Sequence, residues 1–129
     1  MSSEVPAPVA IVDDDPSVRR AFARLLRACD YPVETYASAE DFLATSDPSG
    51  IACLVVDVQM PGMTGLQLLE QLAPSGAMPP TLIITAYDDG TTAAQARRHG
   101  AGFLLKPFES ATLLAAVGEL IGRDLELGT

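Results

Sequence analysis

The chain of 129 residues has no tryptophan, a single histidine and few basic residues. Its 8 Lys and Arg residues stand against 17 Asp and Glu residues, which gives a formal net charge of -9 at pH 7. Non-specific nucleic-acid binding is driven by basic side chains that release counterions from phosphates. We therefore expect that a chain this acidic does not bind nucleic acid on its own.

Cysteine is also scarce, since only Cys29 and Cys53 are present and they form no CxxC motif. Both lie in apolar stretches, so we expect two buried thiols in a reducing compartment. The N-terminus has no basic segment ahead of an apolar run, which excludes a secretory signal. No apolar run approaches the ~18 residues of a membrane span. These absences predict a cytoplasmic protein without a membrane segment.

The remaining composition is that of a chain that can bury a core, with 48% hydrophobic and 19% charged residues. At this length we expect one domain, because chains divide into separate cores only at roughly 250 residues or more. We place the domain at residues 8–122, with an N-terminal tail at 1–7 and a C-terminal tail at 123–129.

Short apolar runs alternate with longer amphipathic segments along the chain. This alternation is typical of an α/β fold, a doubly wound parallel sheet with helices on both faces. The run at 31–36 is weak and contains Pro32, which favours an edge strand, whereas 52–56 and 81–84 are apolar throughout, as interior strands are. Five strands are predicted in all, at residues 9–12, 31–36, 52–56, 81–84 and 103–105.

The helices between these strands have recognisable starts and ends. Asp15 suits the N-cap of the first helix, whose apolar stripe we expect to reach Cys29. The helix at about 90–99 offers mainly alanines to the core, so it should pack thinly before Gly100 ends it. Capping patterns mark the second and third helices, at Ser38 with Asp41 and at Thr64 with Gln67.

A polar residue follows the carboxyl end of each strong strand. The carboxyl ends of parallel strands share one edge of a sheet, and ligands bind there at the point where the strand order reverses. We therefore expect these polar side chains to lie together. They are Asp13 and Asp14 after the first strand, Asp57 after the third, Thr85 after the fourth and Lys106 after the fifth.

This combination of side chains indicates phosphoryl transfer. Three neighbouring carboxylates repel one another, which favours either a raised pKa or a hard divalent cation, and Mg²⁺ is the cation that we expect. A lysine ammonium and a threonine hydroxyl beside it can bind the oxygens of a phosphoryl group. A carboxylate nucleophile in such surroundings can accept that group.

Four motifs resemble the receiver domain of two-component response regulators. They occur in the order IVDDDP (11–16), VVDVQMPGMTG (55–65), IITAY (83–87) and LLKPF (104–108). The resemblance covers residues 9–122. Within the family, the sequence most resembles the regulators of nitrogen fixation and nodulation. It implies a flavodoxin-like single domain whose five-stranded parallel sheet has the order 2-1-3-4-5.

The same resemblance implies the roles of the acidic residues. Asp57 would be the phospho-acceptor, and Asp13 and Asp14 would hold Mg²⁺ together with Asp57 and the backbone carbonyl of Gln59. An aspartate-nucleophile phosphatase is the enzyme alternative. Such enzymes usually need a second acid two residues after the nucleophile, where this chain has Gln59.

The remaining site residues follow from the resemblance in the same way. Thr85 would follow the phosphoryl group, Lys106 would pair with one of its oxygens, and Pro107 would follow a cis peptide bond. The segment before Lys106 is one residue shorter than the family pattern, which leaves Phe103 or Leu104 at the aromatic switch position. We prefer Phe103, because a loop absorbs the deletion while the lysine keeps its reach.

The implied function is that of a phospho-acceptor signalling domain, not an enzyme, which assists its own phosphorylation and dephosphorylation. The implied partners are a sensor histidine kinase or phosphotransfer protein, and an output domain or target protein. A phosphorylation-dependent homodimer through the 90–99 helix, the fifth strand and the last helix is a further option. A receiver-like interaction module that has lost phosphorylation is the other alternative, although all five pocket residues are present. The sequence suits a complete single-domain regulator or part of a longer one.

Overall fold

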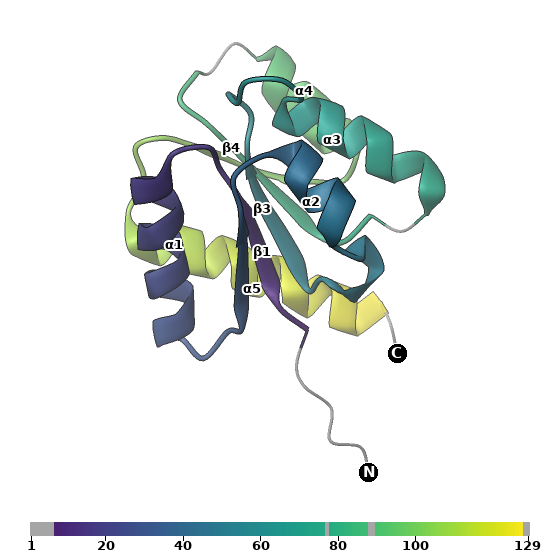
Figure 1. The fold of residues 1–129 in the computed structure, drawn as a ribbon. Coiled ribbons are helices and arrows are strands. Elements are labelled where there is room, and N and C mark those ends of the chain that lie inside the picture. Colours follow the sequence, from purple (N-terminus) through teal and green to yellow (C-terminus); the bar gives the residue numbers. More distant parts are fainter. Residues whose placement is uncertain (1–6, 77, 88–89, 128–129) are drawn as a thin grey trace.

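The computed structural model describes residues 7–76, 78–87 and 90–127, with side chains described as far as Gly122 (Figure 1). Five parallel strands form one sheet in the order β2-β1-β3-β4-β5, which confirms the predicted doubly wound, flavodoxin-like fold with β2 at an edge. The strands are β1 (Val9–Val12), β2 (Val33–Tyr36), β3 (Cys53–Asp57), β4 (Thr81–Thr85) and β5 (Gly102–Leu105).

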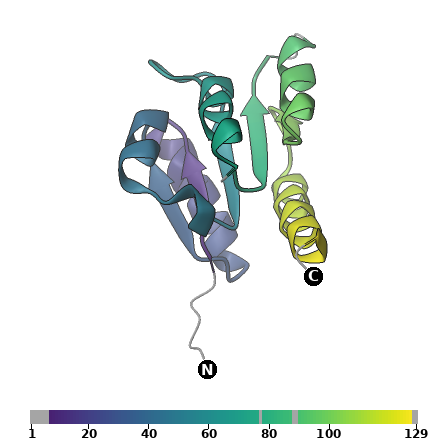
Figure 2. The same cartoon turned by 90° about the vertical axis from the view of Figure 1, so that its right-hand side faces the viewer.

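Five α-helices cover the two faces of this sheet, with α1 and α5 on one face and α2, α3 and α4 on the other (Figure 1). Helices α4 and α5 run along the same side of the molecule, as the green and yellow helices of Figure 2. The helices are α1 (Pro16–Ala28), α2 (Ala39–Thr45), α3 (Gly65–Leu72), α4 (Thr91–Arg98) and α5 (Ser110–Leu127), with short 3-10 turns at Pro48–Gly50 and Ala73–Ser75.

Each interior strand contributes to two cores, because successive side chains point to opposite faces. In β3, Leu54 and Val56 pack under α2, α3 and α4, whereas Cys53 and Val55 pack under α1 and α5. All four side chains are buried, which explains why the sequence run is apolar without alternation. The helix α4 buries only Thr92 and Ala96, so its contact with the sheet is thin, as predicted.

The N-cap residues lie at the edge of the sheet where the strands end, and Gly100 lies at the other edge, just before β5. Asp15 caps α1 by accepting two backbone N–H groups, and Gly100 follows α4 with a φ of 73°. Thr64 and Gln67 form the complete reciprocal capping box of α3, whereas Ser38 makes one half of the pattern at α2. The predicted helix starts are therefore confirmed.

Two expectations differ from the structure. Cys29, which is predicted to be buried, is exposed, because α1 ends at Ala28 and the helical spacing no longer applies at the C-cap. Cys53 is buried as expected, and this burial raises the pKa of its thiol to about 12. Helix α5 continues to Leu127, past Gly122, into the segment where a tail is predicted. The predicted tail at 1–7 lies outside the described residues except for Ala7.

Within the part of the chain that is described, no helix is long and apolar enough to cross a membrane.

Gly65 begins α3 so close to β3 that a side chain has no room there. A Cβ atom added at Gly65 would lie 2.6 Å from the carbonyl oxygen of Asp57, whereas one added at Gly122 in α5 would meet nothing within 4 Å. We expect Gly65→Ala to lower the free energy of unfolding by about 1 to 3 kcal/mol. The control Gly122→Ala should raise it by up to about 1 kcal/mol through helix propensity. Urea unfolding measures both, and an equal gain in the two variants would contradict the close approach.

Candidate functional site

The carboxyl ends of four strands bring the predicted site residues to one edge of the sheet. Asp13 directly follows β1 and is 3% exposed, Asp57 ends β3 and is 7% exposed, and Thr85 ends β4 with no exposure. Lys106 follows β5 and is partly buried. Buried polar groups of this kind are unusual unless they are paired, so their contacts decide what the site can do.

The principal contact is an ion pair between Lys106 Nζ and Asp57 Oδ2, 2.9 Å apart. The backbone N–H of Lys106 donates to the carbonyl oxygen of Thr85 at 2.8 Å, which continues the β4–β5 pairing, and the Lys106–Pro107 peptide bond is cis. Burial alone would lower the pKa of Lys106, but its hydrogen bond to Asp57 and the charges of Asp57 and Asp13 outweigh burial and raise that pKa. The lysine therefore stays an ammonium at neutral pH.

The other oxygen of Asp57 is also engaged. The backbone N–H of Gln59 donates to Asp57 Oδ1 at 2.9 Å, and the N–H of Val58 donates to the Ile84 carbonyl at 2.9 Å, which extends the sheet past the end of β3. Both carboxylate oxygens therefore have a fixed donor. The carboxylate is held in one orientation at the rim of the sheet.

Asp13 lies in a more strained electrostatic position. Its Oδ1 accepts from the backbone N–H of Asp15 at 2.9 Å. Burial raises the pKa of Asp13 to about 6; that hydrogen bond and Lys106 partly oppose the change, and the charges of Asp57 and Asp14 add to it. The pocket therefore has more negative charge than a single lysine neutralises.

Gln59 makes a side-chain contact that sequence reasoning missed. Thr85 Oγ1 donates to Gln59 Oε1 at 3.0 Å, and the backbone N–H of Tyr87 donates to Thr85 Oγ1 at 3.1 Å. The sequence analysis assigned only a backbone carbonyl to Gln59. The available signal was its place just past β3, next to the end of the neighbouring strand β4.

Asp14 is exposed, unlike Asp13 and Asp57. Within the described ranges, no group of three or more His, Cys, Asp or Glu side chains is arranged to hold a metal ion. The three carboxylates are thus not gathered as a ready-made triad. What the structure offers a hard cation is two buried carboxylates, with the charge of Asp14 acting on Asp13.

Phe103 lies on the face of the sheet that α4 covers. It pairs in register with Ile83 and packs, partly buried, against the core that includes Ala96 of α4. Leu104 points to the opposite face and packs with the core under α1 and α5. Of the two candidates for the aromatic switch position, Phe103 is therefore the one beside α4, the helix with few buried side chains.

A parallel sheet in this order, with buried acids, a threonine and a lysine at one edge, defines a CheY-like α/β domain. A receiver domain structure from Clostridium thermocellum aligns with a TM-score of 0.86 at 25% identity, over 94% of this chain and 98% of that one. Residues 9–118 match the family model "Response regulator receiver domain". The chain belongs to this family.

Individual relatives show which members of the family this chain resembles. The transcriptional regulatory protein FixJ of Azorhizobium caulinodans is 40% identical over 122 residues, 94% of this chain and 58% of FixJ. Nodulation protein W of Bradyrhizobium diazoefficiens is 37% identical over 90% of this chain and 52% of its own length. The structure of the response regulator StyR aligns with a TM-score of 0.85 at 40% identity, over 93% of this chain and 62% of that one. The predicted likeness to nitrogen-fixation and nodulation regulators is confirmed, and the chain spans about half the length of the curated relatives that it matches.

The raised pKa of Asp13 predicts how stability depends on pH. An acid whose pKa rises from 3.8 to about 6 on folding binds its proton more tightly in the folded state, so stability is lost as pH rises from 4 to 6. Without divalent cations, we expect Asp13→Asn to gain about 1 to 2 kcal/mol over wild type between pH 4 and pH 7. Urea unfolding at several pH values measures this. Asp30→Asn, which removes the same charge at an exposed position, is the control, and a pH-independent gain in Asp13→Asn would refute the assignment.

Proposed function

We propose that this domain accepts a phosphoryl group on Asp57 from a sensor histidine kinase or a phosphotransfer protein. Membership of the receiver family implies a two-component system and hence a kinase partner. The observation that carries the proposal is the pairing of Lys106 Nζ with Asp57 Oδ2 at 2.9 Å, beside the buried Thr85. A buried nucleophile with an adjacent ammonium and hydroxyl suits a transferring phosphoryl group.

In the proposed step, a carboxylate oxygen of Asp57 attacks the phosphorus of the donor. A P–O bond forms as the P–N bond to the donor's histidine breaks, and the imidazole leaves with the electron pair and takes up a proton. Lys106 moves from the carboxylate to an oxygen of the transferred group, and its raised pKa keeps it charged for that purpose. The backbone N–H of Gln59 holds the carboxylate in line during attack.

Receiver domains are typically Mg²⁺-dependent, and the donor atoms here fit such an ion. Asp13 and Asp57 offer hard carboxylate oxygens. Burial, with the charges of Asp57 and Asp14, raises the pKa of Asp13, so a cation beside that carboxylate is favoured. We assign the ion to Asp13, Asp14 and Asp57 with the backbone carbonyl of Gln59. When bound, Mg²⁺ supplies positive charge that offsets the negative oxygens of the phosphoryl group.

The transferred group becomes a signal through Thr85. To bond a phosphoryl oxygen, the Thr85 hydroxyl must leave Gln59 Oε1, its acceptor 3.0 Å away. Its movement opens space under α4, into which Phe103 can turn. We propose that the surface formed by α4, β5 and α5 then changes shape for an output domain, a target protein or a second copy of this chain.

Phosphorylation is tested by intact-mass measurement after incubation with acetyl phosphate and Mg²⁺. Wild type and the control Asp30→Asn should each gain one phosphoryl group, because Asp30 lies in the turn between α1 and β2, at the edge where the strands begin and not where Asp57 lies. Asp57→Asn should gain none, since an amide is no nucleophile for phosphorus, and chelation of Mg²⁺ should abolish the adduct in all three. An adduct that survives Asp57→Asn would move the acceptor elsewhere.

The switch is tested by amide exchange with and without beryllofluoride, which mimics a phosphoryl group on an aspartate. Wild type should change its protection in α4, β5 and α5 as well as around Asp57 and Lys106. In Thr85→Ala the changes near Asp57 should remain, but those in α4 and β5 should be lost, because no hydroxyl follows the bound group. Changes confined to the loops after β3 and β5 in wild type would show that the signal does not run through Thr85 and Phe103.

A further inference from the structure

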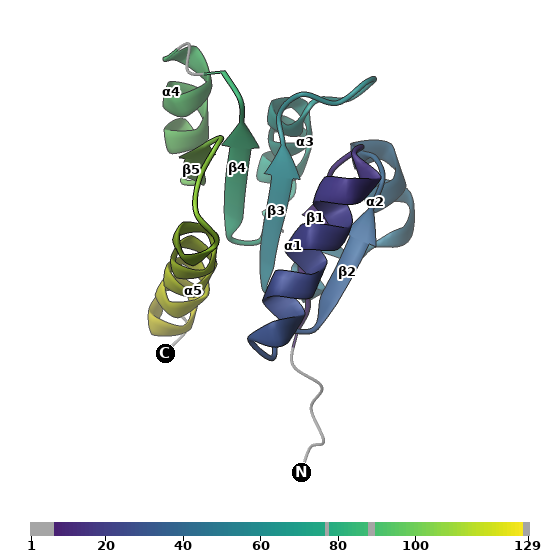
Figure 3. The same ribbon diagram turned by 90° about the vertical axis from the view of Figure 1, so that its left-hand side faces the viewer.

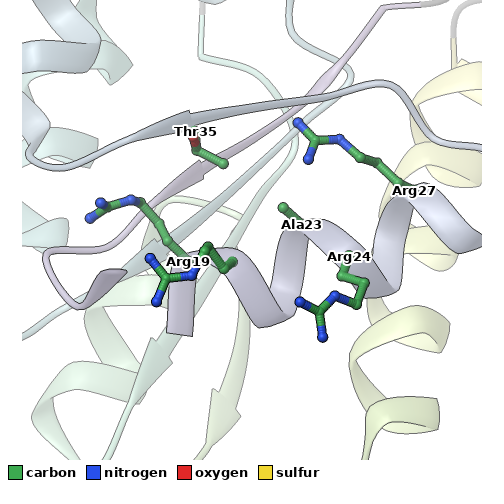
Figure 4. A pocket seen from close by; sticks show the side chains of 6 residues that line it. Arg19, Ala23, Arg24, Arg27 and Thr35 are labelled. Carbon is green, nitrogen blue, oxygen red and sulfur yellow. The ribbon is translucent and has the colours of Figure 1, made fainter. Parts of the chain in front are cut away.

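Half of the basic residues of this acidic chain line one groove. Of its 8 Lys and Arg residues, four lie on α1 beside the edge strand β2, in a chain of net charge -9. The groove has a volume of about 450 Å³, and Figure 4 shows Arg19 and Arg27 on either side of Thr35 of β2. Its lining is Arg19, Arg20, Ala23, Arg24, Arg27 and Thr35.

These arginines have no acidic partner in the described part of the chain. Arg19 donates to the carbonyl oxygen of Asp13 at 2.7 Å and Arg27 to that of Val33 at 3.2 Å, and both acceptors are neutral. Lys106 with Asp57 is the one salt bridge among the described residues. The first turn of α1 also carries no acid, although a helix N-terminus favours negative charge. Of the four arginines, only Arg27 lies in the last turn, where a cation stabilises the helix end, so the helix dipole does not account for the other three.

The spacing of the arginines suits an extended segment with several negative charges. Arg20, Arg24 and Arg27 follow one another at i, i+4 and i+7, on one stripe of the helix about 10 Å long. Four helical residues advance about 6 Å, close to the ~6.6 Å between alternate side chains of an extended chain. Arg19 and Arg27 are already held by carbonyl oxygens, so the groove loses little freedom when it binds.

We propose that the groove between α1 and β2 binds an acidic segment of a partner polypeptide, with alternate carboxylates on its arginines. Guanidinium groups bind carboxylates through two parallel hydrogen bonds, which gives the contact direction as well as charge. Four arginines on a chain of net charge -9 are too few for nucleic acid. The arginines are spread along about 10 Å of the helix, so one small anion cannot contact all of them. The groove does not require phosphorylation, so this inference stands apart from the proposed function.

The test uses a fluorescein-labelled peptide of alternating glutamate and serine, eight residues long, and fluorescence anisotropy with the full chain at low salt. Arg20→Glu with Arg24→Glu should weaken binding at least about tenfold, because two contacts become repulsive. Arg97→Glu with Arg98→Glu on α4 changes the net charge by the same amount and should stay within about twofold. Asp57→Asn should bind as wild type does, which separates this result from any failure of phosphorylation.

Several outcomes would overturn the proposal. Equal losses in the two double variants would mean that net charge alone governs binding, and no binding by wild type would remove the site. An oligonucleotide of equal charge that binds more tightly than the peptide would make nucleic acid the occupant. If inorganic phosphate displaces the peptide at a phosphate concentration equal to the peptide's own Kd, the groove is a site for small anions and not for a peptide. Circular dichroism melting checks that each variant folds, and Arg20→Gln with Arg24→Gln repeats the test if charge reversal prevents folding.

Discussion

The carboxylates of Asp13 and Asp57 are both buried at one edge of the sheet, and a single ammonium, that of Lys106, lies beside them. Burying an ionised group is costly unless a partner compensates it, and Lys106 compensates only Asp57 directly. Burial raises the pKa of Asp13, and the charge of Asp57 adds to that rise. An imbalance of this kind favours any further positive charge that enters the pocket.

The rest of the fold is what allows these groups to meet. Because β1 and β3 are neighbours in the sheet, the residues that follow them lie side by side although they are far apart in the chain. The pairing of β4 with β5 continues through the backbone N–H of Lys106, which fixes where its side chain begins. Gly65 lets α3 approach the carbonyl of Asp57, so the loop between β3 and α3 stays tight. The site is thus made by topology and close backbone packing before any side chain contributes.

Much of this was predictable because it depends on local patterns of known period. The apolar runs identified every strand within a residue or two, and the capping residues Asp15 and Thr64 located helix starts. Properties that depend on the end of an element or on a rotamer were not predictable. Cys29 is exposed because α1 stops one residue earlier, and the contact between Thr85 and Gln59 needed the side-chain positions of two neighbouring strands.

The two proposed surfaces lie at opposite edges of the sheet. Strands β2 and β5 are its outer strands, and Figure 3 shows α1 beside β2 at one end and β5 with α4 and α5 at the other. A segment bound in the arginine groove therefore does not compete for space with a partner on α4, β5 and α5. The two surfaces are still connected through the site, because Arg19 of the groove donates to the carbonyl oxygen of Asp13, and Asp13 lies in the same charged pocket as Asp57. A ligand that contacts Arg19 would act on the loop carrying Asp13, whereas the proposed phosphoryl group would act on Thr85. Docking would thus reach the pocket from the end of β1 and phosphorylation from the end of β4, and each effect can be measured while the other surface is unoccupied.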